Sequence, residues 1–294
     1  MRISVNGVWL YFDVDGCGLA ALDKDMTARP TVLLLPGGPG GDHSFFKPDF
    51  AAMTDAAQVI YLDPRGTGRS DHGDPSRWTW DQWADDVAAF CEKLEIRSPV
   101  LVGTSGGGRI AISCAVRHPD LAGGVVTDST LFGPGSLADS LAVFERRGGP
   151  LAREAAERMF GGDTSPEANM AWRTHALPVY GSANDGDLRA RAARSRTSRE
   201  VFRRFRRGGC GPLEITAPEL NAVRCPVLVL AGEDDPASPA ASARRVTDAA
   251  GRPDLALHVF PEVAHGVFRQ APERAFGLLR EFLAETGTRP DQGT

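Results

Sequence analysis

Hydrophobic and polar residues alternate along residues 3–15, and Asn6-Gly7 inside this stretch is a two-residue turn signal. This pattern predicts an antiparallel hairpin near the start of the chain. Further along, apolar residues form short continuous runs at 31–35, 59–62, 99–102, 124–126 and 227–230, followed by a more alternating run at 255–260. Continuous apolar runs of this length are typical of strands that are buried on both faces of a parallel sheet.

Helical periodicity fills the gaps between these runs. A helix is predicted over 83–94, where large apolar residues recur at helical spacing. A second helix, around 110–116, should end before Pro119, because the residue before a proline disfavours helical geometry. A third covers 268–283. Buried strands that alternate with amphipathic helices predict an α/β fold, with a mostly parallel central sheet flanked by helices.

One long stretch, residues 133–222, contains no strong strand run. Helical pieces are expected there around 137–144 and 201–205, separated by glycines and prolines. We therefore predict an inserted helical cap at 133–222, between a first part of the core at 1–132 and a second part at 223–294. Arginines crowd the cap between 189 and 207. A solvated helix face paired with acids elsewhere explains them better than the steering of an anionic substrate.

Composition narrows the class of protein. The chain has 294 residues, of which 42% are hydrophobic and 24% charged, and this balance excludes a disordered chain or a coiled coil. A formal net charge of −5 disfavours a nucleic-acid binder. The five cysteines form no C-x-x-C pair, so neither a disulfide framework nor a zinc ribbon is predicted. With no signal-peptide pattern and no long apolar run, a cytoplasmic protein without a membrane partner is expected.

The strongest chemical signal is the stretch Gly103-Thr104-Ser105-Gly106-Gly107. It follows a predicted buried strand and opens a predicted helix. A serine on such a sharp turn presents its hydroxyl above the sheet edge, with small neighbours that let other backbones approach. The pattern G-x-S-x-G also arises by chance as a plain turn, so its position between strand and helix is what favours Ser105 as a nucleophile.

A serine hydroxyl needs a base to remove its proton and a third group to orient that base. His265 lies in the loop after the last strand, where ligands of parallel sheets bind, and it is the predicted base. The other histidines have structural explanations: His258 lies in a strand, His118 ends a helix, His175 belongs to the cap, and His43 and His72 are expected to be solvated in polar loops.

The orienting acid is predicted at Asp235, in the loop after the strand at 227–230. Asp234 is the near alternative and Asp128, after the strand at 124–126, is a third candidate. Each of these residues could instead form an Asx turn or cap a helix.

Acyl transfer also requires N–H donors aimed at the oxyanion. The glycine-rich loop 36–41 follows a buried strand, and we predict that the N–H groups of Gly38 and Gly106 form the oxyanion hole. The loop lacks the Gly-Lys-Ser/Thr of a phosphate cradle, and its prolines interrupt any dinucleotide fingerprint.

The order Ser105, Asp235, His265, together with Asp63-Pro64-Arg65-Gly66-Thr67-Gly68-Arg69-Ser70 and the glycine loop, resembles an α/β-hydrolase. Within that fold the chain looks most like the prolyl aminopeptidase branch, over residues 1–132 and 223–294. The resemblance implies that Asp235, in Gly232-x-x-Asp235, holds the acid position. The sequence departs from the family at Pro36, where a histidine is usual, and at Gly106, where aminopeptidases commonly have tryptophan.

These observations predict a serine hydrolase that acts through an acyl-enzyme on a small amide or peptide N-terminus. An esterase or lactonase is the alternative, and a non-hydrolytic cyclase, lyase or small-molecule receptor is the alternative of another class. No metal or organic cofactor is implied, the partner is a small-molecule or short peptide substrate, and the sequence leaves the oligomeric state open. An aminopeptidase would need an acid to hold the substrate ammonium group. Those available are Glu200, Glu214, Glu219 and Asp187.

Overall fold

The computed structural model describes the chain except for residues 23, 134–135, 164, 182–187 and 287–294. Its centre is an eight-stranded sheet in the order β1-β2-β6-β5-β7-β8-β9-β10. These strands are β1 (Arg2–Val5), β2 (Val8–Asp15), β5 (Thr31–Leu35), β6 (Gln58–Leu62), β7 (Val100–Thr104), β8 (Gly124–Asp128), β9 (Val227–Gly232) and β10 (Leu255–Phe260). The strands from β6 to β10 in this order are parallel, whereas β1 and β2 pair antiparallel. The predicted hairpin and the predicted mostly parallel sheet are both confirmed.

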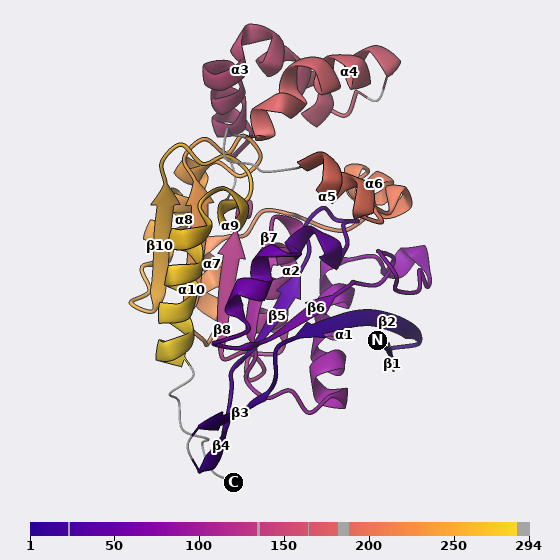
Figure 1. Ribbon diagram of the computed structural model, residues 1–294. Helices are drawn as coiled ribbons and strands as arrows, with labels where there is room; N and C mark the ends of the chain where they lie inside the picture. The colour runs from indigo at the N-terminus through magenta and orange to yellow at the C-terminus, as the bar shows by residue number, and fades with distance from the viewer. Residues whose placement is uncertain (23, 134–135, 164, 182–187, 287–294) are drawn as a thin grey trace.

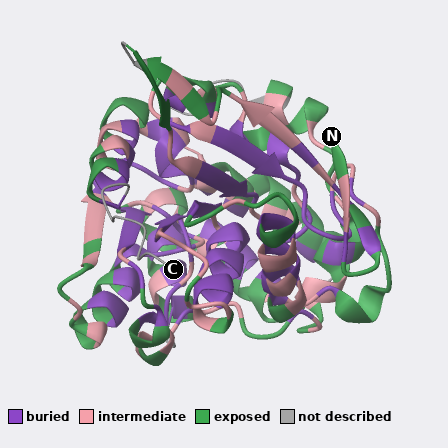
Figure 2. Cartoon of the chain, turned by 90° about the horizontal axis from the view of Figure 1, so that it is seen from below, coloured by how far each residue is buried: buried purple, intermediate pink, exposed green. Residues whose placement is uncertain are grey.

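Helices cover both faces of the sheet. On one face lie α1 (Trp80–Lys93), α2 (Gly106–Arg117) and α8 (Ala240–Ala250), and on the other lie α9 (Val267–Gln270) and α10 (Pro272–Thr286). Successive strand residues contribute to opposite cores: Leu33 packs with the helices of the first face, and Leu34 packs with those of the second. Because every second side chain enters a different core, the strands are apolar throughout, as their sequences indicate. Figure 2 shows these buried strands inside a more exposed shell.

The C-terminal helix differs from its prediction. A single helix was expected over 268–283, but the helix is interrupted at Ala271 and α10 begins at Pro272. Proline has no backbone N–H and its ring excludes the preceding turn, so it starts a new helix more readily than it continues one.

The segment between β8 and β9, called here the β8–β9 segment, is helical. Its helices are α3 (Ser136–Phe160), kinked at Gly149, α4 (Pro166–Ala171), α5 (Leu188–Arg194), α6 (Arg199–Arg206) and α7 (Ala217–Ala222), with single turns at Trp172–Ala176 and Leu177–Tyr180. In Figure 1 α3 and α4 stand beyond the carboxyl ends of the strands. Leu141 and Phe144 pack in a small core of their own, whereas Leu137 is 50% exposed.

The strands β3 (Leu19–Leu22) and β4 (Asp25–Ala28) form a separate two-stranded sheet that the sequence did not predict. It projects from the core at the lower edge of Figure 1, and all four residues of β4 are exposed. The described side chains of this hairpin are exposed or only partly buried, so they form no apolar alternation and leave no periodic signal in the sequence. None of the helices in the described part of the chain is long and apolar enough to cross a bilayer.

Candidate active site

Ser105 lies on the turn between β7 and α2 with φ 54° and ψ −121°, a conformation that non-glycine residues rarely adopt. Close packing of backbones makes this turn possible. A Cβ on Gly107 would lie 1.9 Å from the carbonyl oxygen of Leu35, and a Cβ on Gly103 would lie 2.3 Å from the carbonyl carbon of Gly107. These two glycines are therefore required by space, and they hold Ser105 at the carboxyl end of the sheet as predicted.

His265 and Asp235 are brought together by the loops after β10 and β9. Nδ1 of His265 lies 2.9 Å from Oδ2 and 3.1 Å from Oδ1 of Asp235. The Asp235 side chain is fully buried and the His265 side chain is 19% exposed. Asp235 Oδ1 also accepts hydrogen bonds from the N–H groups of Ala237, at 2.8 Å, and Ser238, at 3.0 Å. The carboxylate is thus held in place from both sides, with the imidazole against it.

The protonation of His265 is governed by opposing effects. Burial disfavours the charged imidazolium, but the negative charge of Asp235, its hydrogen bond and the charge of Asp128 outweigh burial. The pKa of His265 is therefore raised above its ordinary value. An imidazole with this bias readily accepts a proton, which is what a general base does.

The carboxylates of the other two candidate acids accept hydrogen bonds from groups other than the His265 ring. Asp234 forms an ion pair with Arg146, with 2.7 Å between Oδ1 and the guanidinium. Asp128 accepts a hydrogen bond from the N–H of Val267 at 2.8 Å. Of the three carboxylates that the sequence leaves open, the structure joins Asp235 to His265 by a hydrogen bond.

Ser105 and His265 are not joined directly. Among the described residues, no hydrogen bond connects the Ser105 hydroxyl with the imidazole. Their turns are linked through Asp128, whose backbone oxygen accepts the Ser105 N–H at 2.8 Å. In free enzymes the bond between nucleophile and base is often long and tightens when substrate binds.

The glycine loop lies against the serine turn. A Cβ on Gly37 would lie 3.1 Å from Cβ of Ser105, and one on Gly106 would lie 3.2 Å from the carbonyl oxygen of Gly38. Neither the Gly38 N–H nor the Gly106 N–H donates to another residue in the described part of the chain. Two amides without an internal acceptor beside a serine are suited to bind a developing oxyanion.

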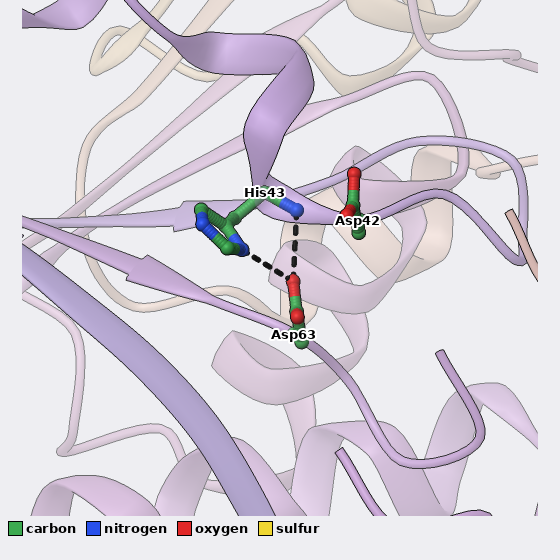
Figure 3. Close-up of side chains that lie close together, drawn as sticks. All are labelled: Asp42, His43 and Asp63. Atoms are coloured by element: carbon green, nitrogen blue, oxygen red, sulfur yellow. Dashed lines mark hydrogen bonds and ion pairs between the residues drawn. The ribbon is translucent and has the colours of Figure 1, made fainter. Parts of the chain in front are cut away.

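A second polar cluster, which sequence reasoning missed, lies behind the glycine loop. Figure 3 shows Asp42, His43 and Asp63 close together, all buried. His43, expected to be solvated, is only 5% exposed: its Nδ1 and its backbone N–H each lie 2.8 Å from Asp63 Oδ1. The expectation was wrong because Asp63, fully buried after β6, must accept hydrogen bonds. The signal was present in the motif that begins at Asp63, which resembles a turn built around a buried acid.

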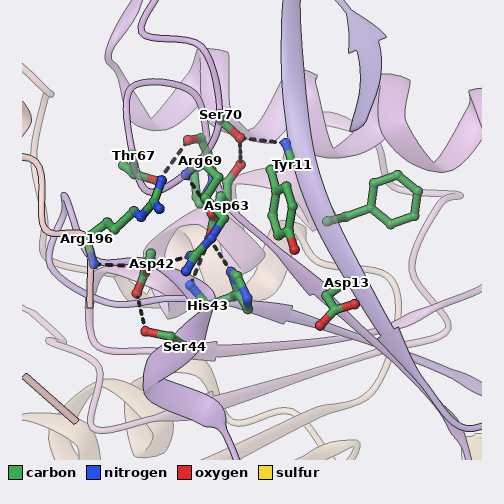
Figure 4. A network of polar contacts seen from close by, with 12 residues as sticks. Tyr11, Asp13, Asp42, His43, Ser44, Asp63, Thr67, Arg69, Ser70 and Arg196 are labelled. Atoms are coloured by element: carbon green, nitrogen blue, oxygen red, sulfur yellow. Dashed lines mark hydrogen bonds and ion pairs between the residues drawn. The ribbon is translucent and has the colours of Figure 1, made fainter. Parts of the chain in front are cut away.

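This cluster offers ligand atoms that could hold a metal ion, but its oxygens already accept hydrogen bonds from the protein. Asp63 Oδ2 accepts the N–H of Arg69 at 2.8 Å, and the guanidinium of Arg69 lies 2.9 Å from Asp42 Oδ2. Asp42 also accepts hydrogen bonds from Ser44 and the backbone N–H of Arg196 (Figure 4). The hydroxyl of Ser195 donates to Asp42 as well. With Arg69 supplying the positive charge, the donor set fits a structural network and not a cation site.

The crowded arginines of the β8–β9 segment also make structural contacts. Arg191 forms an ion pair with Asp49 at 2.8 Å, and Arg204 donates to the backbone oxygens of Ser76 and Trp78. These contacts fasten the segment to the core. They support the interpretation that the arginines serve the structure, and not the steering of an anion.

Together, the eight-stranded sheet, the strained serine turn and the Asp235–His265 pair define an α/β hydrolase. The family model described as Hydrolase_4, serine aminopeptidase S33, matches residues 27–271. The chain therefore belongs to the serine aminopeptidase S33 family of α/β hydrolases, and the predicted fold is confirmed.

Individual relatives hydrolyse different substrates. A proline iminopeptidase of Lactobacillus helveticus (strain DPC 4571) is 26% identical over 285 residues, covering 88% of this chain and 91% of the relative. A 2-(acetamidomethylene)succinate hydrolase of Mesorhizobium japonicum is 27% identical over 264 residues, covering 86% and 87% of the two chains. A solved structure of a thermophilic esterase from Thermogutta terrifontis superposes with a TM-score of 0.64 at 25% identity, covering 98% of this chain and 100% of that chain. The family shows a hydrolase, and the names of these two relatives and of the solved structure describe different hydrolytic activities.

Proposed function

We propose that this protein is a serine hydrolase that forms an acyl-enzyme on Ser105. The observation that carries the proposal is the buried hydrogen bond between Asp235 and His265, at 2.9 Å, on loops beside the strained turn of Ser105. A serine hydroxyl is activated by a nearby imidazole that a buried carboxylate orients, and Ser105 lies on a turn at the carboxyl end of the sheet.

In the first step, His265 accepts the proton of Ser105 as its hydroxyl oxygen attacks the substrate carbonyl. The negative charge that develops on the carbonyl oxygen is stabilised by the N–H groups of Gly38 and Gly106. His265 then gives the proton to the leaving group, and the acyl group remains on Ser105. A water molecule, deprotonated by His265, releases the acid and restores the serine.

The β8–β9 segment, proposed to be the cap, supplies an aromatic side chain to this site. The ring of Tyr180 meets the imidazole of His265 edge-on, with 5.6 Å between centroids. Tyr180 in turn packs against Trp172 at 5.7 Å and Phe144 at 6.0 Å. The guanidinium of Arg147 fixes this arrangement, because it donates to the carbonyl oxygens of Gly181, at 2.8 Å, and Asp234, at 3.0 Å. The wall beside His265 is therefore largely apolar.

Of the four acids that the sequence offers to bind a substrate ammonium group, Glu219 has its carboxylate engaged within the protein. Glu219 pairs with Arg109, and its Oε2 accepts both the N–H and the hydroxyl of Thr216. Glu200 faces solvent, 3.7 Å from Nδ1 of His72. Glu214 meets Arg109 through its backbone oxygen, and Asp187 lies outside the described residues.

The apolar wall beside His265 favours a small uncharged ester or lactone as the substrate. The sequence alone put a peptide N-terminus first. Proline iminopeptidase relatives keep the peptide N-terminus as the second candidate. Both substrates would be cleaved by the same acyl-enzyme chemistry.

A substrate panel tests both levels of the proposal. Steady-state rates are measured with p-nitrophenyl butyrate, an acyl lactone and proline-naphthylamide, for the wild type and for Ser105→Ala. We expect the ester and the lactone to give the highest kcat/KM and Ser105→Ala to lose about 10⁴-fold or more. A preference for proline-naphthylamide would overturn the substrate class alone. Comparable turnover of every substrate by Ser105→Ala would overturn the serine mechanism.

A further inference from the structure

Asp128 ends β8, the strand between the one that carries the serine and the one that carries the orienting acid, and it touches the turns on either side. Its backbone oxygen accepts the N–H of Ser105 at 2.8 Å. Its side chain accepts the N–H of Val267 at 2.8 Å and lies 3.2 Å from the hydroxyl of Thr104. One fully buried residue thus binds the turn of the nucleophile and the loop of the histidine.

Ser129, the next residue, extends these contacts to the loop that carries Asp235. Its hydroxyl donates to Asp128 at 3.0 Å and accepts the N–H of Gly266 at 2.7 Å, directly after His265. Its carbonyl oxygen accepts the hydroxyl of Ser238 at 2.8 Å, while the N–H of Ser238 donates to Asp235. Ser129 has a φ of 51° and is completely buried, so the surrounding contacts hold it in a conformation that a serine does not otherwise favour.

The charge of Asp128 also acts on the imidazole. Three groups interact with His265 electrostatically: Asp235 and Asp128 favour the protonated ring, and Arg269, whose guanidinium donates to the His265 carbonyl oxygen, disfavours it. The phenol of Tyr180 packs against the same ring. Burial outweighs the hydrogen bonds from Val267 and Ser129 and the charge of His265, so the pKa of Asp128 is raised above its ordinary value. The Asp128 carboxylate accepts hydrogen bonds from three donors, as an ionised carboxylate does.

We propose that Asp128 is a positioning residue of the hydrolase and a second acidic partner of His265. It fixes the Ser105 turn and the His265 loop against each other and adds negative charge where the imidazolium forms. The inference rests on the proposed function, since it assigns Asp128 a task in the Ser105–His265 proton transfer. Asp235 orients the ring by direct contact, and Asp128 acts through the backbone and through space.

The test is the pH dependence of kcat/KM for p-nitrophenyl butyrate with Asp128→Asn. Asparagine keeps the size and an acceptor oxygen but removes the charge. Because that charge favours protonated His265, its loss should move the acidic midpoint to lower pH, and kcat/KM at the optimum should fall about 10- to 100-fold. Thr127→Val is the matched control: Thr127 is a buried neighbour on the same strand, and its hydroxyl has no partner in the described part of the chain.

The outcomes separate this inference from the proposed function. Wild-type kcat/KM and midpoint in Asp128→Asn, with Ser105→Ala inactive, would overturn the inference and leave the hydrolase intact. Lower activity with an unchanged midpoint would assign Asp128 a purely structural role and would also overturn it. If Asp128→Asn does not fold, Ser129→Ala serves instead: a fall in kcat with a nearly unchanged KM supports the inference, and a wild-type kcat overturns it.

Discussion

The Oδ2 atom of Asp235 lies 2.9 Å from Nδ1 of His265, although the two residues are 30 positions apart on loops that follow neighbouring parallel strands. The carboxylate is fully buried and the imidazole is 19% exposed. A buried acceptor on one ring nitrogen fixes the tautomer, and in the proposed mechanism Nε2 is then the atom that accepts the proton of Ser105. The proposed role of His265 as a base therefore depends on this one hydrogen bond.

The substitution Asp235→Asn tests that bond. Asparagine can place its amide against Nδ1 and stabilise the wrong tautomer, so kcat should fall about 10⁴-fold. Asp234→Asn is the matched control, because Asp234 is the residue next to Asp235 and its side chain pairs with Arg146 instead of His265. Circular dichroism should be unchanged in both variants. Near wild-type kcat in Asp235→Asn, or a comparable loss in Asp234→Asn, would contradict the assignment of the acid.

The pH profile of kcat/KM should reflect the raised pKa of His265. A general base must be neutral in the free enzyme, so activity is present above the pKa of His265 and disappears as the pH falls through it. Burial alone would move the midpoint below the ordinary histidine value of about 6.5, but Asp235 reverses that effect. The expected midpoint therefore lies above about 6.5. A profile that stays flat well below this value would show that His265 is not the base.

Asp42 should contribute strongly to stability, because its fully buried carboxylate accepts hydrogen bonds from Arg69, Ser44, Ser195 and the Arg196 backbone. Asp42→Ala leaves these donors without an acceptor, and the free energy of unfolding should drop by about 3 kcal/mol in urea titration. Asp120→Ala is the control, because Asp120 is 88% exposed in its pair with Arg224 and should cost less than about 1 kcal/mol. Equal effects of the two substitutions would contradict this account of Asp42.

The same carboxylate predicts an acid dependence. Burial opposes ionisation of Asp42, but the hydrogen bonds from Ser44, Arg196 and Ser195 outweigh it, and its pKa is lowered. The stabilisation is therefore complete above the unfolded value of about 3.9 and is lost as the pH falls through the lower folded value. Acid unfolding of Asp42→Ala should thus be less steep than that of the wild type. Identical transitions would mean that Asp42 does not contribute to acid unfolding.

Removal of metal ions should leave the enzyme unchanged, because donors of the protein occupy the oxygens of Asp42 and Asp63. After dialysis against EDTA, the melting temperature and kcat should match those of untreated protein. A stoichiometric metal in elemental analysis, or a loss of activity that added Zn²⁺ restores, would contradict the structural role of the Asp42–His43–Asp63 cluster.

Much of the fold follows from local patterns. Each continuous apolar run became a strand of the main sheet, because burial on both faces excludes polar side chains from either side. The hairpin at β3 and β4 could not be predicted, since exposed residues such as Met26, at 61%, have no periodic partner.

In the candidate site, too, some residues could be placed from the sequence and others could not. The turn at Ser105 and the loop of His265 could be placed from the sequence, because both follow predicted strands. The choice among Asp235, Asp234 and Asp128 depended on which carboxylate reaches Nδ1 of His265. Side-chain direction decides this, because Asp234 and Asp235 are neighbours on one loop. The burial of His43 depends on its hydrogen bond with Asp63, which directly follows β6 and lies 20 residues further along the chain.

Covalent labelling with a fluorophosphonate, followed by intact mass measurement and peptide mapping, identifies the nucleophile of the protein directly. We expect one adduct per chain, located on Ser105, and no adduct in folded Ser105→Ala. An adduct on another residue, or equal labelling of both proteins, would contradict the claim that Ser105 is the nucleophile.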